Sequence, residues 1–164
     1  MSVIPASFQQ FEFNRVRTLG ILEKIEKESD AASVLGWRPG PARAHIAWQL
    51  MHIGVTEELF AVERLATKEG SFCEYWDRFK GSSIPDDQIP SNQEIRDVLA
   101  AGREDLLETL GEFKEDQLSD VVWEARDGRR LTLQQVLQII SWHEAHHQGQ
   151  AHITFNLFKA AVTQ

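Results

Sequence analysis

Four segments of the chain place apolar residues at helical spacing, and no segment of any length alternates as a strand would. The first segment covers about residues 6–28. The connection over residues 29–41 is rich in proline and glycine, which break helices. The second segment covers about residues 42–68 and stops before Gly70, a residue suited to a helix C-terminus. The first half of the chain therefore predicts two amphipathic helices.

The second half of the chain predicts two more helices of similar length. Ser91 is suited to the N-cap position, and Glu94, three residues later, completes a capping box. That helix ends near residues 111–114, and the last helix covers about residues 132–160. Four amphipathic helices of about twenty residues or more predict an all-α four-helix bundle, with residues 1–164 as a single domain.

A long connection over residues 70–90 joins the second and third helices. A connection of this length in a compact domain is usually a lid or a packed surface loop. Its aromatic residues Tyr75, Trp76 and Phe79 indicate that it packs on the bundle, where it can cover a pocket. A tight turn is expected at residues 127–128, an Asp-Gly pair.

Composition and charge exclude several classes of protein. The chain of 164 residues is 42% hydrophobic and 26% charged, which is typical of a globular protein. Its 17 basic and 25 acidic residues give a net charge of −8, which disfavours general binding to nucleic acid or to anionic membranes. A single cysteine, Cys73, excludes an internal disulfide. No secretory signal or membrane span is evident, so a cytoplasmic location is expected.

Candidate chemistry lies in the six histidines, four of which fall on the last predicted helix. At 100° per residue, His143 and His147 lie about 40° apart, in the middle of the apolar stripe that must face the core. His146 lies at the edge of that stripe, and His152 faces water. On the second helix, His52 lies on the buried face, while His45 shares this face but is two turns away.

Two inward histidines at positions i and i+4 are close enough to chelate one divalent ion. If the second and last helices are neighbours, His52 can join His143 and His147 in a three-histidine site with open positions for water or substrate. That arrangement is typical of a catalytic metal ion. The alternative is that these residues are hydrogen-bonded core histidines, which is the commoner role of a lone inward histidine such as His52.

The segment from His143 to His147 also matches the zinc hydrolase motif H-E-x-x-H, in which the glutamate, here Glu144, is the general base. Proteases with this motif take a third ligand from further along the chain. The extended motif would need glycine at position 150 and histidine at position 153, where this chain has Gln150 and Ile153. A third ligand must therefore come from upstream, which disfavours the protease interpretation.

These histidine motifs resemble those of the DinB-like proteins. The segment over residues 48–53, Trp-Gln-Leu-Met-His-Ile, is similar to the family's W-x-L-x-H motif, and residues 143–150 resemble its histidine-rich motif in the last helix. The aromatic-rich first helix with Phe13-Asn14-Arg15 is also similar. The resemblance covers nearly the whole chain.

The resemblance implies a four-helix bundle that binds a divalent metal ion through His52, His143 and His147. It also implies a homodimer. Several members of the family transfer low-molecular-weight thiols such as bacillithiol or mycothiol, and others are described as metal-dependent hydrolases.

The leading hypothesis is a metalloenzyme that activates a thiol or water for a small-molecule substrate, with Glu144 and Gln150 near the metal. All-imidazole ligation suits zinc, nickel, iron or copper. The alternatives are a non-catalytic bundle that binds metal structurally or not at all, and a module that binds a partner protein through its acidic surface.

Overall fold

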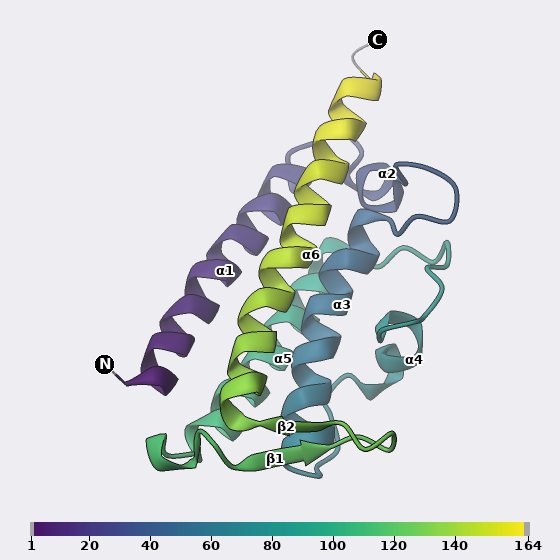
Figure 1. Cartoon of the computed structure of the whole chain (residues 1–164). Coiled ribbons are helices and arrows are strands. Elements are labelled where there is room, and N and C mark those ends of the chain that lie inside the picture. Colours follow the sequence, from purple (N-terminus) through teal and green to yellow (C-terminus); the bar gives the residue numbers. More distant parts are fainter. Residues whose placement is uncertain (1, 163–164) are drawn as a thin grey trace.

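The computed structural model describes residues 2–162, which form a bundle of four long helices (Figure 1). These helices are α1 (Val3–Glu26), α3 (Ile46–Glu58), α5 (Asn92–Gly111) and α6 (Leu133–Val162). Helix α6 contacts both α1 and α3, and α3 also packs along α5. The prediction of an all-α bundle is confirmed, and α3 and α6 are the neighbours that a shared histidine site requires.

Shorter elements occupy the connections between the long helices. The capping box predicted at the start of α5 is confirmed, because Ser91 Oγ accepts a hydrogen bond from the Glu94 amide and the Glu94 carboxylate accepts one from the Ser91 amide. In chain order, the short elements are α2 (Ala31–Gly36), the π-helix η1 (Leu59–Leu65), the 3₁₀ helix η2 (Cys73–Tyr75), α4 (Trp76–Phe79), the 3₁₀ helix η3 (Glu115–Gln117), β1 (Val121–Glu124) and β2 (Arg130–Thr132).

Helix α3 is the central helix of the bundle, and every residue from Ile46 to Glu58 is buried. The sequence placed its start near residue 42, which is wrong, although His45 is buried as expected. The His45 Nδ1 atom accepts a hydrogen bond from the Trp48 amide at 3.0 Å, so His45 is the N-cap that begins the helix. Past Glu58, the chain continues as the π-helix η1, which has a wider turn than an α-helix.

Helices α3 and α5 approach each other closely at two glycines. A Cβ atom on Gly54 would lie 2.7 Å from the carbonyl oxygen of Val98, and one on Gly102 would overlap the carbonyl oxygen of Gly54. Both clashes involve backbone atoms, which cannot rotate away as a flexible side chain can. The spacing of the two helices therefore depends on the absence of side chains at these positions.

The Gly102→Ala substitution is expected to lower the free energy of unfolding by about 1–3 kcal/mol, because its methyl group would force α3 and α5 apart. Chemical denaturation measures this change. Gly149→Ala is the matched control, since a Cβ at this position in α6 meets nothing within 4 Å. It should stabilise the helix by about 0.5–1 kcal/mol. A Gly102→Ala protein as stable as wild type would contradict the close crossing.

The long connection before α5 packs on α3 through Glu58. The Glu58 carboxylate accepts hydrogen bonds from the Phe72 amide at 2.8 Å and from Trp76 Nε1 at 2.6 Å. Phe79, at the end of α4, is buried in the core. These contacts confirm that the aromatic residues of this connection pack on the bundle.

A two-stranded antiparallel hairpin, β1–β2, lies across the end of the bundle where α6 begins (Figure 1). Its turn is the one predicted at residues 127–128: the Gly128 amide donates to the Ala125 carbonyl at 2.9 Å, and Gly128 has a φ of 83°, which glycine adopts without strain. The sequence did not predict the strands themselves, because four and three residues are too few to show alternation.

The longest helix, α6, has 30 residues and carries the histidine-rich segment in its middle. Polar residues interrupt its apolar stripe. Within residues 2–162, no helix combines the length and the apolar character needed to cross a membrane.

Candidate metal centre

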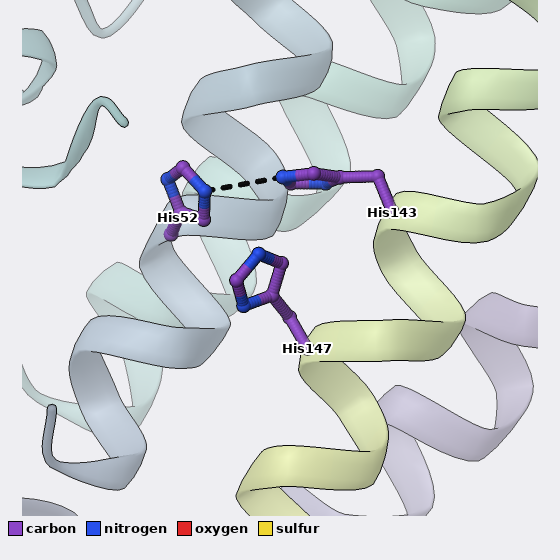
Figure 2. A group of neighbouring side chains, drawn as sticks. All are labelled: His52, His143 and His147. Carbon is purple, nitrogen blue, oxygen red and sulfur yellow. Dashed lines mark hydrogen bonds between the residues drawn. The ribbon is translucent and has the colours of Figure 1, made fainter. Parts of the chain in front are cut away.

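Three histidine side chains converge between α3 and α6 (Figure 2). His52 comes from α3, and His143 and His147 lie one turn apart on α6. One ring nitrogen from each can be chosen so that all three lie within 4.8 Å of one another, and the Nε2 atoms of His52 and His143 are 3.1 Å apart. These are the three histidines that the helical periodicity of the sequence predicts on the inward faces of the two helices.

The separation of two of these nitrogens fits a shared divalent ion. Two imidazole nitrogens at about 2.0–2.1 Å from one ion lie about 2.8–3.4 Å apart, for bond angles between the octahedral and tetrahedral values. The 3.1 Å between His52 and His143 falls within this range. Three imidazoles also form a donor set that suits zinc, nickel, copper and iron. The residues present therefore fit a divalent metal ion.

His52 is held by contacts on both its edge and its face. Its Nδ1 atom lies 2.6 Å from the carbonyl oxygen of Phe79, in the long connection. A carbonyl oxygen can only accept, so this bond places the proton on Nδ1 and leaves the lone pair of Nε2 directed at the other histidines. The ring of Trp48 stacks on the imidazole at 4.6 Å between centroids, which fixes the plane of the ring.

His147 is oriented in the same way by a side chain of α3. Its Nδ1 atom lies 2.6 Å from Oε1 of Gln49, and this oxygen accepts a hydrogen bond from the protonated Nδ1. In metal sites, a hydrogen bond from the second ring nitrogen to an oxygen acceptor commonly orients the ligand. Gln49 lies next to Trp48 in the W-x-L-x-H motif, but its role could not be predicted, because only the fold shows which histidine it faces.

Burial keeps the three imidazoles uncharged. Burial, followed by the charges of neighbouring groups, lowers the pKa of His143 to about 2 and that of His147 to about 3. Burial also lowers the pKa of His52, and it outweighs the hydrogen bond to the Phe79 carbonyl, which by itself would raise this pKa. Neutral imidazole is the form that binds metal ions, so the cluster has the required protonation state at neutral pH.

The metal-free protein is expected to lose stability as the pH falls from 7 to 5. The pKa values of the folded histidines lie below the ordinary value of 6.5. The unfolded chain therefore binds more protons than the folded chain in this window, so that acid favours unfolding. Urea denaturation at several pH values measures the slope. His143→Gln should reduce the slope of the unfolding free energy against pH, whereas the control His152→Gln, at an exposed residue, should not. Equal slopes in wild type and His143→Gln would contradict this account.

The other histidines lie outside the cluster. His45 caps α3, and the exposed His152 faces water as predicted. His146 is exposed and stacks on Trp142 at 4.8 Å between centroids. Gln150 was expected near the metal, and its Nε2 atom lies 2.9 Å from Nε2 of His146. A hydrogen bond from Gln150 also raises the pKa of His147, against the effect of burial. Gln150 is thus beside the cluster but makes no hydrogen bond to His52 or His143.

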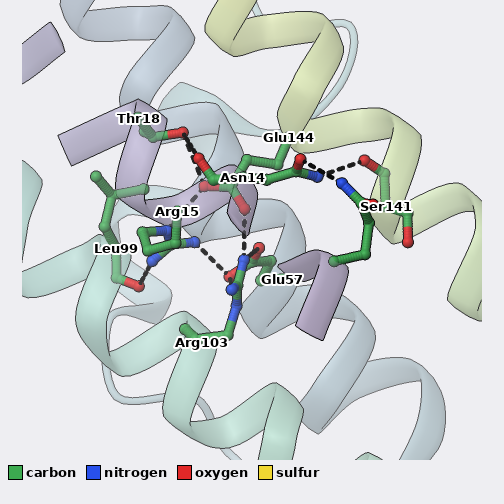
Figure 3. Close-up of polar contacts among 9 residues, drawn as sticks. Asn14, Arg15, Thr18, Glu57, Leu99, Arg103, Ser141 and Glu144 are labelled. Carbon is green, nitrogen blue, oxygen red and sulfur yellow. Dashed lines mark hydrogen bonds and ion pairs between the residues drawn. The ribbon is translucent and has the colours of Figure 1, made fainter. Parts of the chain in front are cut away.

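Glu144 points away from the histidines, into a buried ion-pair network on the α1–α5 side of α6 (Figure 3). One of its carboxylate oxygens accepts hydrogen bonds from Arg15 and Thr18, both at 2.8 Å, and the other accepts one from Arg103. This placement corrects the expectation that Glu144 lies near the metal. Both of its oxygens are engaged by other side chains, which also argues against its use as the base of an H-E-x-x-H hydrolase.

The network joins all four long helices. Glu57 of α3 accepts a hydrogen bond from Arg15 of α1 at 2.8 Å and one from Arg103 of α5 at 2.6 Å, and Glu144 of α6 pairs with the same two arginines. Burial alone would lower the pKa of Arg103, but the two carboxylates outweigh it and raise the pKa. The four charges balance, and together they set how α6 docks on α3, where the histidines meet.

Two pockets flank the histidine cluster. One, of about 570 Å³, is lined by His52 and His143 at the end of the bundle that the hairpin covers. The other, of about 380 Å³, is lined by Gln49 and Gln150, next to His147. The long connection contributes residues 80–82 to the larger pocket, whereas Tyr75, Trp76 and Phe79, expected to cover it, pack on the bundle instead.

The fold and the site define a class of protein: a four-helix bundle with three imidazoles gathered between two of its helices. The family model described as the DinB superfamily matches residues 10–151. Because this match covers most of the chain, the protein belongs to the DinB superfamily, as its histidine motifs indicated.

A solved structure supports the fold independently. The chain is similar to a conserved protein from Enterococcus faecalis, with a TM-score of 0.72 and 20% sequence identity over 96% of this chain and 97% of that chain. At this level of identity, the similarity concerns the fold. Among curated proteins, none matches the chain.

Proposed function

We propose that this protein is a metal-dependent enzyme that uses a divalent ion bound by His52, His143 and His147 to act on a small-molecule substrate. The reaction is thiol transfer or hydrolysis. The observation that carries the proposal is the convergence of three neutral imidazoles at one point between α3 and α6. Membership of the DinB superfamily supports it.

The surroundings of the cluster favour catalysis over a purely structural ion. Structural zinc sites are usually closed by four protein ligands, whereas three protein ligands leave positions open for water or substrate. The pocket of about 570 Å³ reaches two of the three histidines, so a small molecule has access to the site. A divalent ion held there lowers the pKa of a thiol or of water, which makes the nucleophile available near neutral pH.

The protein's own residues hold the site in place before any ligand arrives. The Phe79 carbonyl and Gln49 fix the tautomers of His52 and His147, and Trp48 fixes the plane of His52. The buried network around Glu57 and Glu144 fixes α6 against α3. Preorganised ligands of this kind lose little conformational freedom when they bind an ion.

Turnover with and without metal tests the proposal. The untagged protein is stripped of metal, reloaded with zinc, nickel or iron, and assayed for conjugation of cysteine to an aryl chloride and for hydrolysis of p-nitrophenyl acetate. We expect turnover that depends on metal, is lost in His147→Ala, and is retained in the control His152→Ala, whose side chain is exposed. Turnover that survives both metal removal and His147→Ala would contradict the proposal.

The alternative is a non-catalytic metal-binding bundle with the same three ligands. It predicts metal bound in the same assays without turnover of any thiol or ester. The open pocket beside His52 and His143 favours the enzyme over this alternative, because a purely structural ion needs no such access.

A further inference from the structure

The larger pocket is basic although the chain as a whole is acidic. Arg64, Lys80 and Arg129 line it, and Glu63 is the one carboxylate among its lining residues. The whole chain has a net charge of −8. Cations that line a candidate site attract anions to it.

Of these three cations, Arg64 packs against aromatic rings of the pocket. Its guanidinium lies over the ring of Phe60 at 4.2 Å and over that of Trp123 at 5.0 Å, and the residue is half-buried. Lys80 and Arg129 each pair with a nearby aspartate, but no carboxylate of residues 2–162 forms an ion pair or a hydrogen bond with Arg64. A half-buried guanidinium has five donors to satisfy, so it is suited to accept an anion from outside.

Two irregular elements place Arg64 there. The π-helix η1 carries both Phe60 and Arg64, and such segments are frequent at functional sites. The hairpin supplies Trp123 from β1 and Arg129 from its turn. Arg64 and His143 line the same pocket, so a ligand bound there can contact both side chains.

We propose that this pocket binds the oxyanion of the substrate, a carboxylate or a phosphate monoester, through Arg64, and thereby positions the rest of the molecule against His52 and His143. That the bound anion is the substrate rests on the proposed function; binding of an anion by Arg64 does not. Guanidinium groups bind both oxyanions with paired hydrogen bonds. The walls formed by Phe60, Trp123 and Leu131 suit a ligand with an apolar body behind its charged end.

Calorimetric titration of the full chain with phenylacetate, phenyl phosphate and the neutral phenylacetamide tests this inference. We expect one or both anions to bind more tightly than the amide. Arg64→Gln should weaken anion binding by about 10- to 100-fold, since bonds to charged groups of this kind are worth that much. Arg64→Lys should keep part of the affinity. Arg126→Gln, an exposed arginine outside the pocket lining, is the control and should change nothing.

A second variant separates this inference from the metal site. In His52→Ala, which removes a proposed metal ligand, anion binding through Arg64 should persist. Binding lost in His52→Ala but kept in Arg64→Gln would mean that the anion binds a metal ion at the histidines, which overturns the role of Arg64 and supports the metal site. Equal binding of the amide and both anions, or equal losses in Arg64→Gln and Arg126→Gln, would also overturn it. Circular dichroism confirms that each variant is folded.

Discussion

Replacing Glu144 by alanine is expected to lower the free energy of unfolding by about 3–5 kcal/mol, because it leaves Arg15 and Arg103 buried without one of their two carboxylates. Removing one partner of a buried ion pair costs more than the pair contributes, since the remaining charge stays desolvated. Urea denaturation at neutral pH measures the loss. For a domain of this size, the variant is expected to be only marginally folded.

Two control variants separate the role of Glu144 in the buried network from a role at the histidines. Glu104→Ala removes an exposed carboxylate from α5 and should change stability by no more than about 0.5 kcal/mol. Glu144→Gln, which keeps the shape of the side chain, should be destabilised but should still bind metal once folded. A stable Glu144→Ala protein that has lost its metal would show that Glu144 serves the histidines rather than the network.

Replacing Gln49 by alanine is expected to weaken metal binding by about 10- to 100-fold, although Gln49 is not a proposed ligand. The substitution removes the oxygen that accepts a hydrogen bond from Nδ1 of His147, so the ring is free to turn and to change tautomer. Competition with a chromophoric chelator measures the affinity.

Gln49→Glu retains an oxygen acceptor at this position and should preserve most of the affinity. Gln138→Ala, an exposed residue on α6, is the control and should leave it unchanged. Wild-type affinity in Gln49→Ala would mean that the hydrogen bond does not orient the ligand.

The helices and the histidine cluster could be predicted because both follow from periodicity. Long segments with apolar residues every three to four positions specify helices, and the angle between His143 and His147 follows from their spacing alone. His52 could be added because the apolar face of its helix must point at the same core. The short helix α2 and the hairpin were missed because neither is long enough to show a period.

The partners of the site residues could not be predicted, because they depend on the path of the chain between helices. The Phe79 carbonyl reaches His52 only because the long connection folds back on α3. Glu144 lies one residue from His143, which turns it by about 100° toward α1 and α5, and its two arginines become visible only once those helices are packed. Arg64 reaches the pocket through a π-helix, whose register no α-helical periodicity describes.

These observations connect the stability of the fold to the geometry of the site. The network of Arg15, Glu57, Arg103 and Glu144 joins α6 to α1, α3 and α5 within the core. One turn of the same α6 segment presents His143 and His147 to α3. In this segment of α6, Glu144 thus stabilises the packing of the bundle, while the neighbouring His143 and His147 contribute to the candidate metal centre.

The central claim is that His52, His143 and His147 bind one divalent metal ion, and elemental analysis tests it most directly. The protein is purified without a histidine tag, alongside His52→Ala. We expect about one metal ion per chain in wild type and a loss of that metal in the variant. Wild-type protein without metal, whose thermal stability does not change on adding zinc or nickel, would contradict the claim and leave the three histidines as packed core residues.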